Sequence, residues 1–246
     1  MSRSFELLTE IEPEREMRVT DTRAPAAVDR AAAQSVIRSN ISDVYSEELL
    51  RLVQGIFLSA DASSPRQVVF CGVDNENGSS TVCASAGRTL AANNLQSVCL
   101  IEANVRSPRL SNILGVEETT AFSRKPVSLL EQCVQIDVNL WLGKPDLLAS
   151  NGRKLLPVDE LRKRLAQLRE AFEYVLINAP GINGSGEAQL LGQVADAVIL
   201  VIEANRTRRL TARKAKETLD AAGVRLLGTV LNNRTFAIPE AIYRKL

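Results

Sequence analysis

The chain has 246 residues, of which 45% are hydrophobic, and this is enough to bury one sizeable core. Its 30 basic and 29 acidic residues nearly cancel, so the overall charge gives no reason to expect nucleic acid or an anionic membrane as a partner. The absence of histidine excludes His-based metal sites and Ser-His or Cys-His catalytic groups. Any catalysis would depend on carboxylates and hydroxyls.

The four cysteines lie in or beside apolar runs without C-x-x-C spacing: Cys71, Cys83, Cys99 and Cys133. This pattern favours buried, reduced thiols over disulfides or a zinc site, and therefore a cytoplasmic protein. No stretch of the sequence approaches the 18 consecutive apolar residues of a membrane span. We therefore expect membrane association only through a partner.

Residues 1–44 are predicted to form a flexible arm ahead of a single domain at 45–246. Pro13 and Pro25 interrupt this arm, which lacks a sustained apolar stripe. Residues 5–11 have apolar side chains at every third position and fit either a short docking helix or a frayed terminus. The domain should begin with a helix over 46–58, packed on the domain or on a neighbouring subunit.

Six apolar runs that do not alternate with polar residues predict the strands of the domain, at 67–72, 97–102, 138–142, 174–178, 196–202 and 225–231. Helical patterns separate several of them, notably at 158–172 and 211–222. Such strands belong to a mostly parallel sheet that is covered on both faces. The expected fold is a three-layer α/β/α domain with its ligand site at the carboxyl ends of the strands.

Residues 72–81, Gly-Val-Asp-Asn-Glu-Asn-Gly-Ser-Ser-Thr, stand between a strand and a helix, where a nucleotide-binding P-loop belongs. In the pattern G-x-x-x-x-G-K-[ST], backbone N–H groups cradle phosphates, the lysine neutralises them and the hydroxyl holds Mg²⁺. Ser79 replaces that lysine. We predict either a polar turn without a ligand or a weak anion or nucleotide site made by Gly78, Ser79, Ser80 and Thr81.

Two later strand ends should present carboxylates to the metal of such a site. The first reads Leu-Ile-Glu-Ala-Asn and offers Glu102 and Asn104, whereas the second ends in Asn178. Asparagine contributes no negative charge to hold a hard divalent cation. For Glu102, an ion pair with a base such as Arg106 is favoured over a role as metal ligand.

Three other features have a simple structural interpretation. The bases between Arg206 and Lys216 fit a solvated helix face better than a phosphate or partner site. Trp141, the only tryptophan, is expected to be buried in a strand. Ser79 has no histidine or suitably spaced lysine to activate it as a nucleophile.

Taken together, these motifs resemble the kinase domain of bacterial tyrosine kinases of capsule and exopolysaccharide synthesis, in the MinD/ParA-like branch of P-loop proteins. The family patterns are G-K-[ST]-T, L-I-D-x-D-x-R-x-P and Y-D-Y-V-[IL]-I-D-x-P-P, and the resemblance covers roughly residues 45–246. The run 226–232, Leu-Leu-Gly-Thr-Val-Leu-Asn, is similar to the last core strand of the family. The resemblance implies an adenine contact for Asn232. It also implies ring assembly through Glu48 and Arg51 of an E-x-x-R-x-x-R helix, in which Gln54 replaces the second arginine.

The departures from the family pattern imply a kinase-like protein that has lost its chemistry. Phosphoryl transfer depends on positioning and on charge neutralisation, and Ser79, Glu102, Asn104 and Asn178 all alter those terms. The family's C-terminal tyrosine cluster is missing as well. We therefore expect no catalytic residue, no metal, no cofactor beyond weak ATP or ADP, and regulation of polysaccharide synthesis or export by protein binding. The implied partners are a membrane polysaccharide co-polymerase, or chain-length protein, and further copies of the chain.

Two enzymatic alternatives remain open. One is a tyrosine autokinase or ATPase that turns over slowly with Glu102 and a rearranged metal site. The other is a MinD/ParA-type positioning ATPase, which is disfavoured because residues 72–77 lack the early lysine of such proteins. The C-terminus also lacks a long basic amphipathic helix that could lie on a membrane.

Overall fold

A computed structural model of the chain describes residues 47–58, 64–75, 77–94, 96–116, 129–150 and 154–233. The expected arm and the segment at 5–11 lie outside the described residues, so those predictions stay untested. The described residues all belong to one compact unit, Asp43–Leu246.

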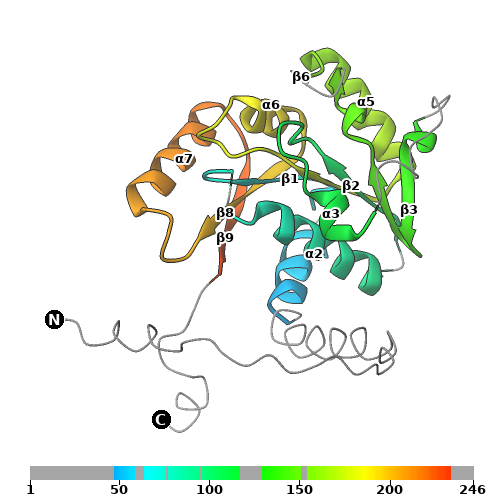
Figure 1. The fold of residues 1–246 in the computed structure, drawn as a ribbon, viewed down its shortest axis with the longest axis horizontal. Coiled ribbons are helices and arrows are strands. Elements are labelled where there is room, and N and C mark those ends of the chain that lie inside the picture. Colours follow the sequence, from blue (N-terminus) through cyan, green and yellow to red (C-terminus); the bar gives the residue numbers. More distant parts are fainter. Residues whose placement is uncertain are drawn as a thin grey trace, which may run out of the picture. The chain divides into compact units, whose positions relative to one another are not determined.

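A seven-stranded sheet forms the centre of this unit, in the order β3-β4-β2-β7-β1-β8-β9 (Figure 1). All neighbouring strands are parallel except β3 and β4, which are antiparallel. The strands are β1 (Gln67–Gly72), β2 (Val98–Glu102), β3 (Cys133–Asp137), β4 (Leu140–Gly143), β7 (Tyr174–Asn178), β8 (Ala197–Glu203) and β9 (Leu226–Asn232). A separate small hairpin consists of β5 (Ala149–Ser150) and β6 (Lys154–Leu155).

Helices cover both faces of the sheet, so the predicted three-layer α/β/α fold is confirmed (Figure 1). One face packs against the helix at 47–57, α2 (Ser79–Asn94) and α3 (Leu110–Leu114). The other packs against α5 (Val158–Ala171), α6 (Glu187–Val194) and α7 (Arg209–Ala221). Two 3₁₀ turns, η1 (Leu130–Gln132) and η2 (Pro145–Leu147), flank β3 and β4. Every residue of β1, β2 and β7 is buried, which explains why their sequences do not alternate.

The helix at 47–57 packs on its own domain, which decides between the two alternatives left open by the sequence. Val53 and Phe57 are buried in the core, and the Phe57 ring meets Tyr174 edge to face with centroids 5.4 Å apart. Glu48 and Arg51 lie on the exposed face of this helix. They remain accessible for a subunit contact.

Several local predictions need correction. The strand β3 and the helix α6 were not predicted, and β4 begins at Leu140 rather than at 138, because Val138 and Asn139 form a turn. Trp141 lies on β4 as expected but is only partly buried, against the ring of Phe172. The missed elements are short, and the alternating residues of β3 lie at a half-exposed edge of the sheet.

All four cysteines are free thiols, and Cys71, Cys83 and Cys99 are buried. Burial raises the pKa of Cys71 to about 12, which keeps it protonated at neutral pH. Cys133 is half-buried, with its Sγ 3.9 Å from that of Cys99. Within the described part of the chain, no helix combines the length and apolar character needed to cross a membrane.

Candidate functional site

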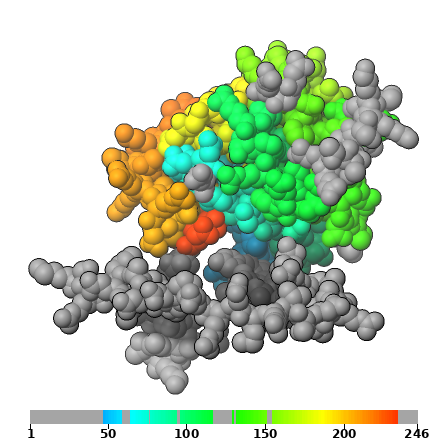
Figure 2. Space-filling view, viewed as in Figure 1, coloured from blue at the N-terminus to red at the C-terminus, as the bar shows by residue number. Residues whose placement is uncertain are grey.

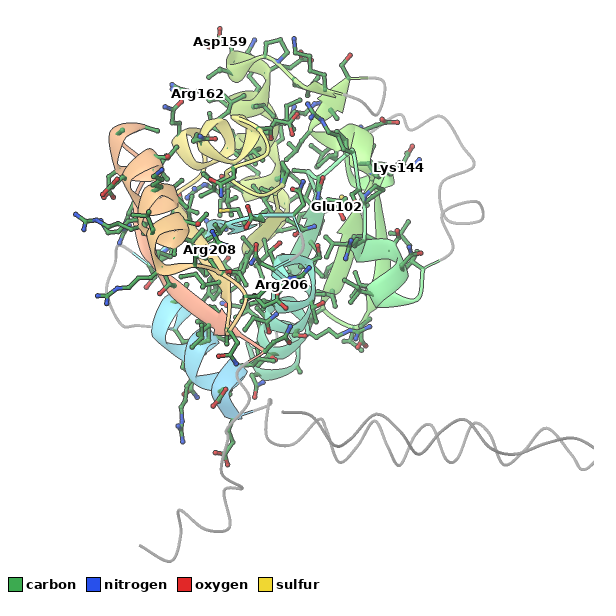
Figure 3. The ribbon with its side chains drawn as sticks, turned by 60° about the vertical axis from the view of Figure 1, so that its left-hand side comes forward. Glu102, Lys144, Asp159, Arg162, Arg206 and Arg208 are labelled. Atoms are coloured by element: carbon green, nitrogen blue, oxygen red, sulfur yellow. The ribbon has the colours of Figure 1, made fainter. Side chains whose placement is uncertain are left out.

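The carboxyl ends of three adjacent strands bring the predicted site residues together. Glu102 of β2 pairs in register with Asn178 of β7, and Phe70 of β1 pairs with Asn178 from the other side. The first turn of α2 follows β1 and brings Ser80 to the same point, where its hydroxyl meets Asn178. Figure 3 shows Glu102 inside the domain, among these elements.

Four N–H groups surround the carboxylate of Glu102. Its Oε1 accepts from the backbone N–H of Asn104 at 3.0 Å and from Nδ2 of Asn178 at 2.7 Å. Its Oε2 accepts from the backbone N–H groups of Arg109 at 2.8 Å and Leu110 at 3.0 Å. A carboxylate has about four lone-pair positions, so all of them are occupied from within the protein.

The predicted ion pair between Glu102 and Arg106 is wrong. Arg106 instead approaches Glu187 of α6, with Nη2 and Oε1 3.8 Å apart. Glu102 is only 3% exposed and compensates its burial with hydrogen bonds. Burial raises the pKa of Glu102, and the four hydrogen bonds oppose that shift without cancelling it.

Asn178 connects the three elements of the site. Its Nδ2 donates to Glu102 on β2 and to Oγ of Ser80 on α2, at 2.7 and 3.0 Å. These contacts fix the amide orientation, because the reverse orientation would turn an oxygen toward the carboxylate. The side chain is fully buried, and its Oδ1 has no hydrogen-bond partner among the described atoms. An aspartate here would place a second carboxylate against Glu102.

The loop after β1 is tied to the segment that follows β7. Oδ1 of Asn75 accepts from the N–H of Gly181 at 2.8 Å, and Oδ1 of Asp74 accepts from Nδ2 of Asn183 at 3.0 Å. A Cβ atom at Gly181 would lie only 2.5 Å from the carbonyl carbon of Asp74, so the two backbones touch. Glycine is required there by close approach rather than by its dihedral angles.

A second set of contacts holds the end of this loop. The amide of Asn77 donates to Oγ1 of Thr207 at 2.9 Å, and Nδ2 of Asn232 donates to the carbonyl of Asn77 at 3.1 Å. Gly78 has a φ of 77°, and a Cβ atom on it would lie 2.1 Å from Nδ2 of Asn232. The side chain of Asn232 is therefore engaged with the loop itself.

The structure brings Ser80, Glu102, Asn104 and Asn178 into one buried cluster. Gly78 and Asn232 contact each other next to this cluster. Ser79 is buried, whereas Thr81 is exposed. Asn77 and Thr207 could not be identified from the sequence, because their contact joins loops 130 residues apart. The bases on α7 lie on a solvated face, as predicted.

The cluster offers poor ligands for a divalent cation. Glu102 has no vacant lone pair, and the only unpaired buried side-chain oxygen among the described residues is the neutral Oδ1 of Asn178. No group of three His, Cys, Asp or Glu side chains in the described ranges could hold a metal ion. The residues present therefore do not fit the Mg²⁺ that the family pattern implies.

Sequence comparison relates the chain to tyrosine kinases. The tyrosine-protein kinase YwqD of Bacillus subtilis is 29% identical over 185 residues, which cover 68% of this chain and 77% of that protein. The tyrosine-protein kinase CpsD of Streptococcus agalactiae serotype III is 26% identical over 160 residues, or 63% of this chain and 68% of that protein. No protein-family model matches the chain.

Solved structures share the fold. The kinase domain of Escherichia coli tyrosine kinase ETK has a TM-score of 0.63 and 16% identity, over 92% of this chain and 88% of that one. The chimerical protein CapA2B2 has a TM-score of 0.62 and 19% identity, over 77% and 85% of the two chains. A chain of the MinC:MinD cell division protein complex of Aquifex aeolicus has a TM-score of 0.57 and 19% identity, over 73% of this chain and 72% of that one. These likenesses show that the chain shares its α/β fold with these proteins.

Proposed function

Because the chain is homologous to bacterial tyrosine kinases, we propose that it is a catalytically degenerate member of that group. It regulates exopolysaccharide or capsule synthesis or export by binding other proteins. The observation that carries the proposal is the saturated carboxylate of Glu102, the only acid that remains at the three positions where the family pattern places acids.

The electrostatics of the site support this proposal. A kinase needs positive charge and metal ions around the phosphates at the moment of transfer. Ser79 provides no positive charge, and Asn104 and Asn178 provide no negative charge to hold a cation. Binding of Mg²⁺ would require breaking some of the four hydrogen bonds that now stabilise Glu102.

The loop contacts also favour a site with little affinity for nucleotide. The resemblance implies that Asn232 contacts adenine, but its amide donates to the loop carbonyl of Asn77. An incoming base would have to compete with that contact. Weak ATP or ADP binding remains compatible with the first turn of α2, where Thr81 is exposed and backbone N–H groups favour an anion.

The proposed partner is a membrane polysaccharide co-polymerase, and the proposed location is the cytoplasmic side of the membrane. The structural likeness to the CapA2B2 chimera supports a partner of this kind. Glu48 and Arg51 are exposed and available for assembly with further copies, although Arg51 approaches Glu47 of its own helix at 3.6 Å. With Gln54 in place of an arginine, closed rings should be weaker than in relatives with the full motif.

An active tyrosine autokinase is the alternative, and the tyrosine-kinase relatives favour it. Under this alternative, Glu102 would leave some of its N–H donors when Mg²⁺ and ATP bind. A rearranged site of this kind would turn over slowly.

Titration of the purified chain with ATP and ADP, with and without Mg²⁺, separates the two functions. The proposal predicts binding no tighter than about millimolar, no dependence on Mg²⁺ and no phosphotyrosine, since the site lacks the charges that hold the nucleotide. Mg²⁺-dependent binding in the micromolar range together with phosphotyrosine would establish the kinase. The homologous kinase YwqD provides the positive control.

A further inference from the structure

The strand β9 presents an open edge of the sheet. Within the described residues it pairs only with β8, and its sequence Leu-Leu-Gly-Thr-Val-Leu-Asn contains no charged residue and no proline. After one irregularity near Val198, its register is regular from Gly228 to Asn232. Exposed sheet edges usually carry lysine, proline or a bulge that prevents further pairing, and this regular stretch has none of them.

The backbone groups of this regular stretch can be assigned to two sides. The carbonyl of Asn232 accepts from the N–H of Ala204 at 2.8 Å, so Asn232 directs its backbone groups toward β8. Because these groups alternate in direction along a strand, those of Thr229 and Leu231 point to the open side. An added strand would find its hydrogen-bonding partners at these two residues.

Apolar side chains are exposed beside this edge. Leu231 is 53% exposed and pairs in register with Ile202, which packs against the core cluster that holds Ala215 of α7. Leu231 therefore projects from the face of the sheet that α7 covers. Leu210, in the first turn of α7, is 66% exposed. Figure 2 shows the end of β9 in red beside the orange segment that leads from β8 into α7.

The same region carries positive charge that its surroundings do not compensate. Arg208 and Arg209 are exposed and make no ion pair within the described part of the chain, whereas Arg213 farther along α7 is paired with Glu217 at 3.0 Å. Figure 3 shows Arg208 on the loop that leads into α7. The first turn of α7 contains no acid, so these arginines lie unfavourably at the positive end of its dipole. An anionic partner would offset that cost.

We propose that Arg208, Arg209, Leu210, Thr229 and Leu231, named here the β9–α7 surface, bind an extended acidic segment of a partner protein. The segment adds to β9 as a further strand, places apolar side chains against the two leucines and directs acidic side chains to the two arginines. A protein segment fits better than a lipid surface, because only another strand supplies N–H and C=O groups at the spacing of the β9 edge. The inference rests on the proposed binding function and names the chemistry of the partner.

The test uses two synthetic peptides with the repeats Val-Thr-Glu-Thr and Val-Thr-Lys-Thr, in which valine and the charged residue alternate along the one face of the strand that meets the leucines and arginines. Binding is measured by fluorescence anisotropy. The acidic peptide should bind about tenfold more tightly than the basic one. Thr229→Pro removes an outward N–H without touching the β8 ladder and should weaken binding about tenfold, whereas Thr229→Val should not. The double change Arg208→Glu and Arg209→Glu should reverse the peptide preference. The matched control, the double change Arg162→Glu and Lys163→Glu on α5, should leave the peptide preference unchanged.

Hydrogen exchange of the unmodified protein provides a measurement that does not depend on the proline variant folding. The amides of Thr229 and Leu231 should gain protection when the acidic peptide is added. Unchanged exchange at both amides would overturn the proposal, as would equal affinities for the two peptides. Phosphatidylserine vesicles provide a further test. If they bind through the arginines and Thr229→Pro does not change that binding, the surface is a membrane site and the proposal is overturned. The nucleotide titration does not depend on these peptide experiments. A negative result for the β9–α7 surface would therefore leave the proposed function standing.

Discussion

Single residues decide what the carboxyl edge of the sheet can do. A strand-end acid serves a metal only when it keeps a free lone pair, and Glu102 has given all of its lone pairs to N–H donors. Asn178 completes this arrangement because its amide can donate, which an aspartate could not do. The two residues together make a buried polar cluster that is satisfied from within, except at Oδ1 of Asn178.

Removal of the Glu102 side chain should destabilise the fold strongly. Glu102→Ala leaves four buried N–H donors without their acceptor, and we expect a loss of about 3 kcal/mol in the free energy of unfolding. Urea denaturation measures the change, and Glu217→Ala on the exposed face of α7 is the matched control. A loss close to that of the control would mean that water replaces the carboxylate without cost, and that the cluster contributes little to stability.

At the level of elements, one carboxylate joins three parts of the fold at the end opposite the candidate site. Oδ2 of Asp196, just before β8, accepts from the N–H groups of Arg66 and Gln67 at the start of β1, both at 2.8 Å. Oδ1 accepts from the guanidinium of Arg169 on α5. Burial tends to raise the pKa of Asp196, but these N–H groups and the Arg169 charge outweigh it and hold the pKa below its ordinary value.

The lowered pKa of Asp196 predicts a specific acid sensitivity. A carboxyl group with a lower pKa in the folded state contributes stability above its unfolded pKa and loses it as the pH falls through the folded value. The contribution of Asp196 should therefore be full above about pH 4 and disappear below it. Asp196→Asn should cost about 1–2 kcal/mol at pH 7 and little at the acid end. Urea denaturation between pH 7 and the acid end measures this cost, with the exposed Asp220→Asn as control. A cost of Asp196→Asn that stays constant over this pH range would contradict the prediction.

For the whole molecule, the sequence was most informative where burial is complete. The fully buried strands β1, β2 and β7 follow from their unbroken apolar runs, and their shared carboxyl edge follows from parallel order. The contacts of Glu102 could not be predicted in the same way. They depend on how residues 103–110 fold back, which brings the N–H groups of Arg109 and Leu110 to the carboxylate. Backbone N–H groups are common to nearly all residue types, so the side-chain pattern does not predict where they point.

Restoring the family residues together tests whether the whole site can still assemble. Asn178→Asp alone should bring no gain in affinity for Mg²⁺-ATP, because it replaces a hydrogen bond to Glu102 by repulsion between two buried carboxylates while Ser79 still leaves the phosphates unneutralised. The triple change Ser79→Lys, Asn104→Asp and Asn178→Asp supplies the cation and the acids at once. It should raise Mg²⁺-ATP affinity at least about tenfold, since metal and lysine together compensate the added charges.

Isothermal titration calorimetry with and without Mg²⁺ measures these affinities, and thermal unfolding of each variant checks its fold. The triple variant should be less stable than the wild type without Mg²⁺ and should recover stability when Mg²⁺-ATP is added, because the ligand then separates the two carboxylates. A folded triple variant with no gain in affinity would show that the contacts of Asn232 and Asn77 close the pocket as well. The proposed loss of catalysis would then involve the shape of the loop as well as the charges of the site.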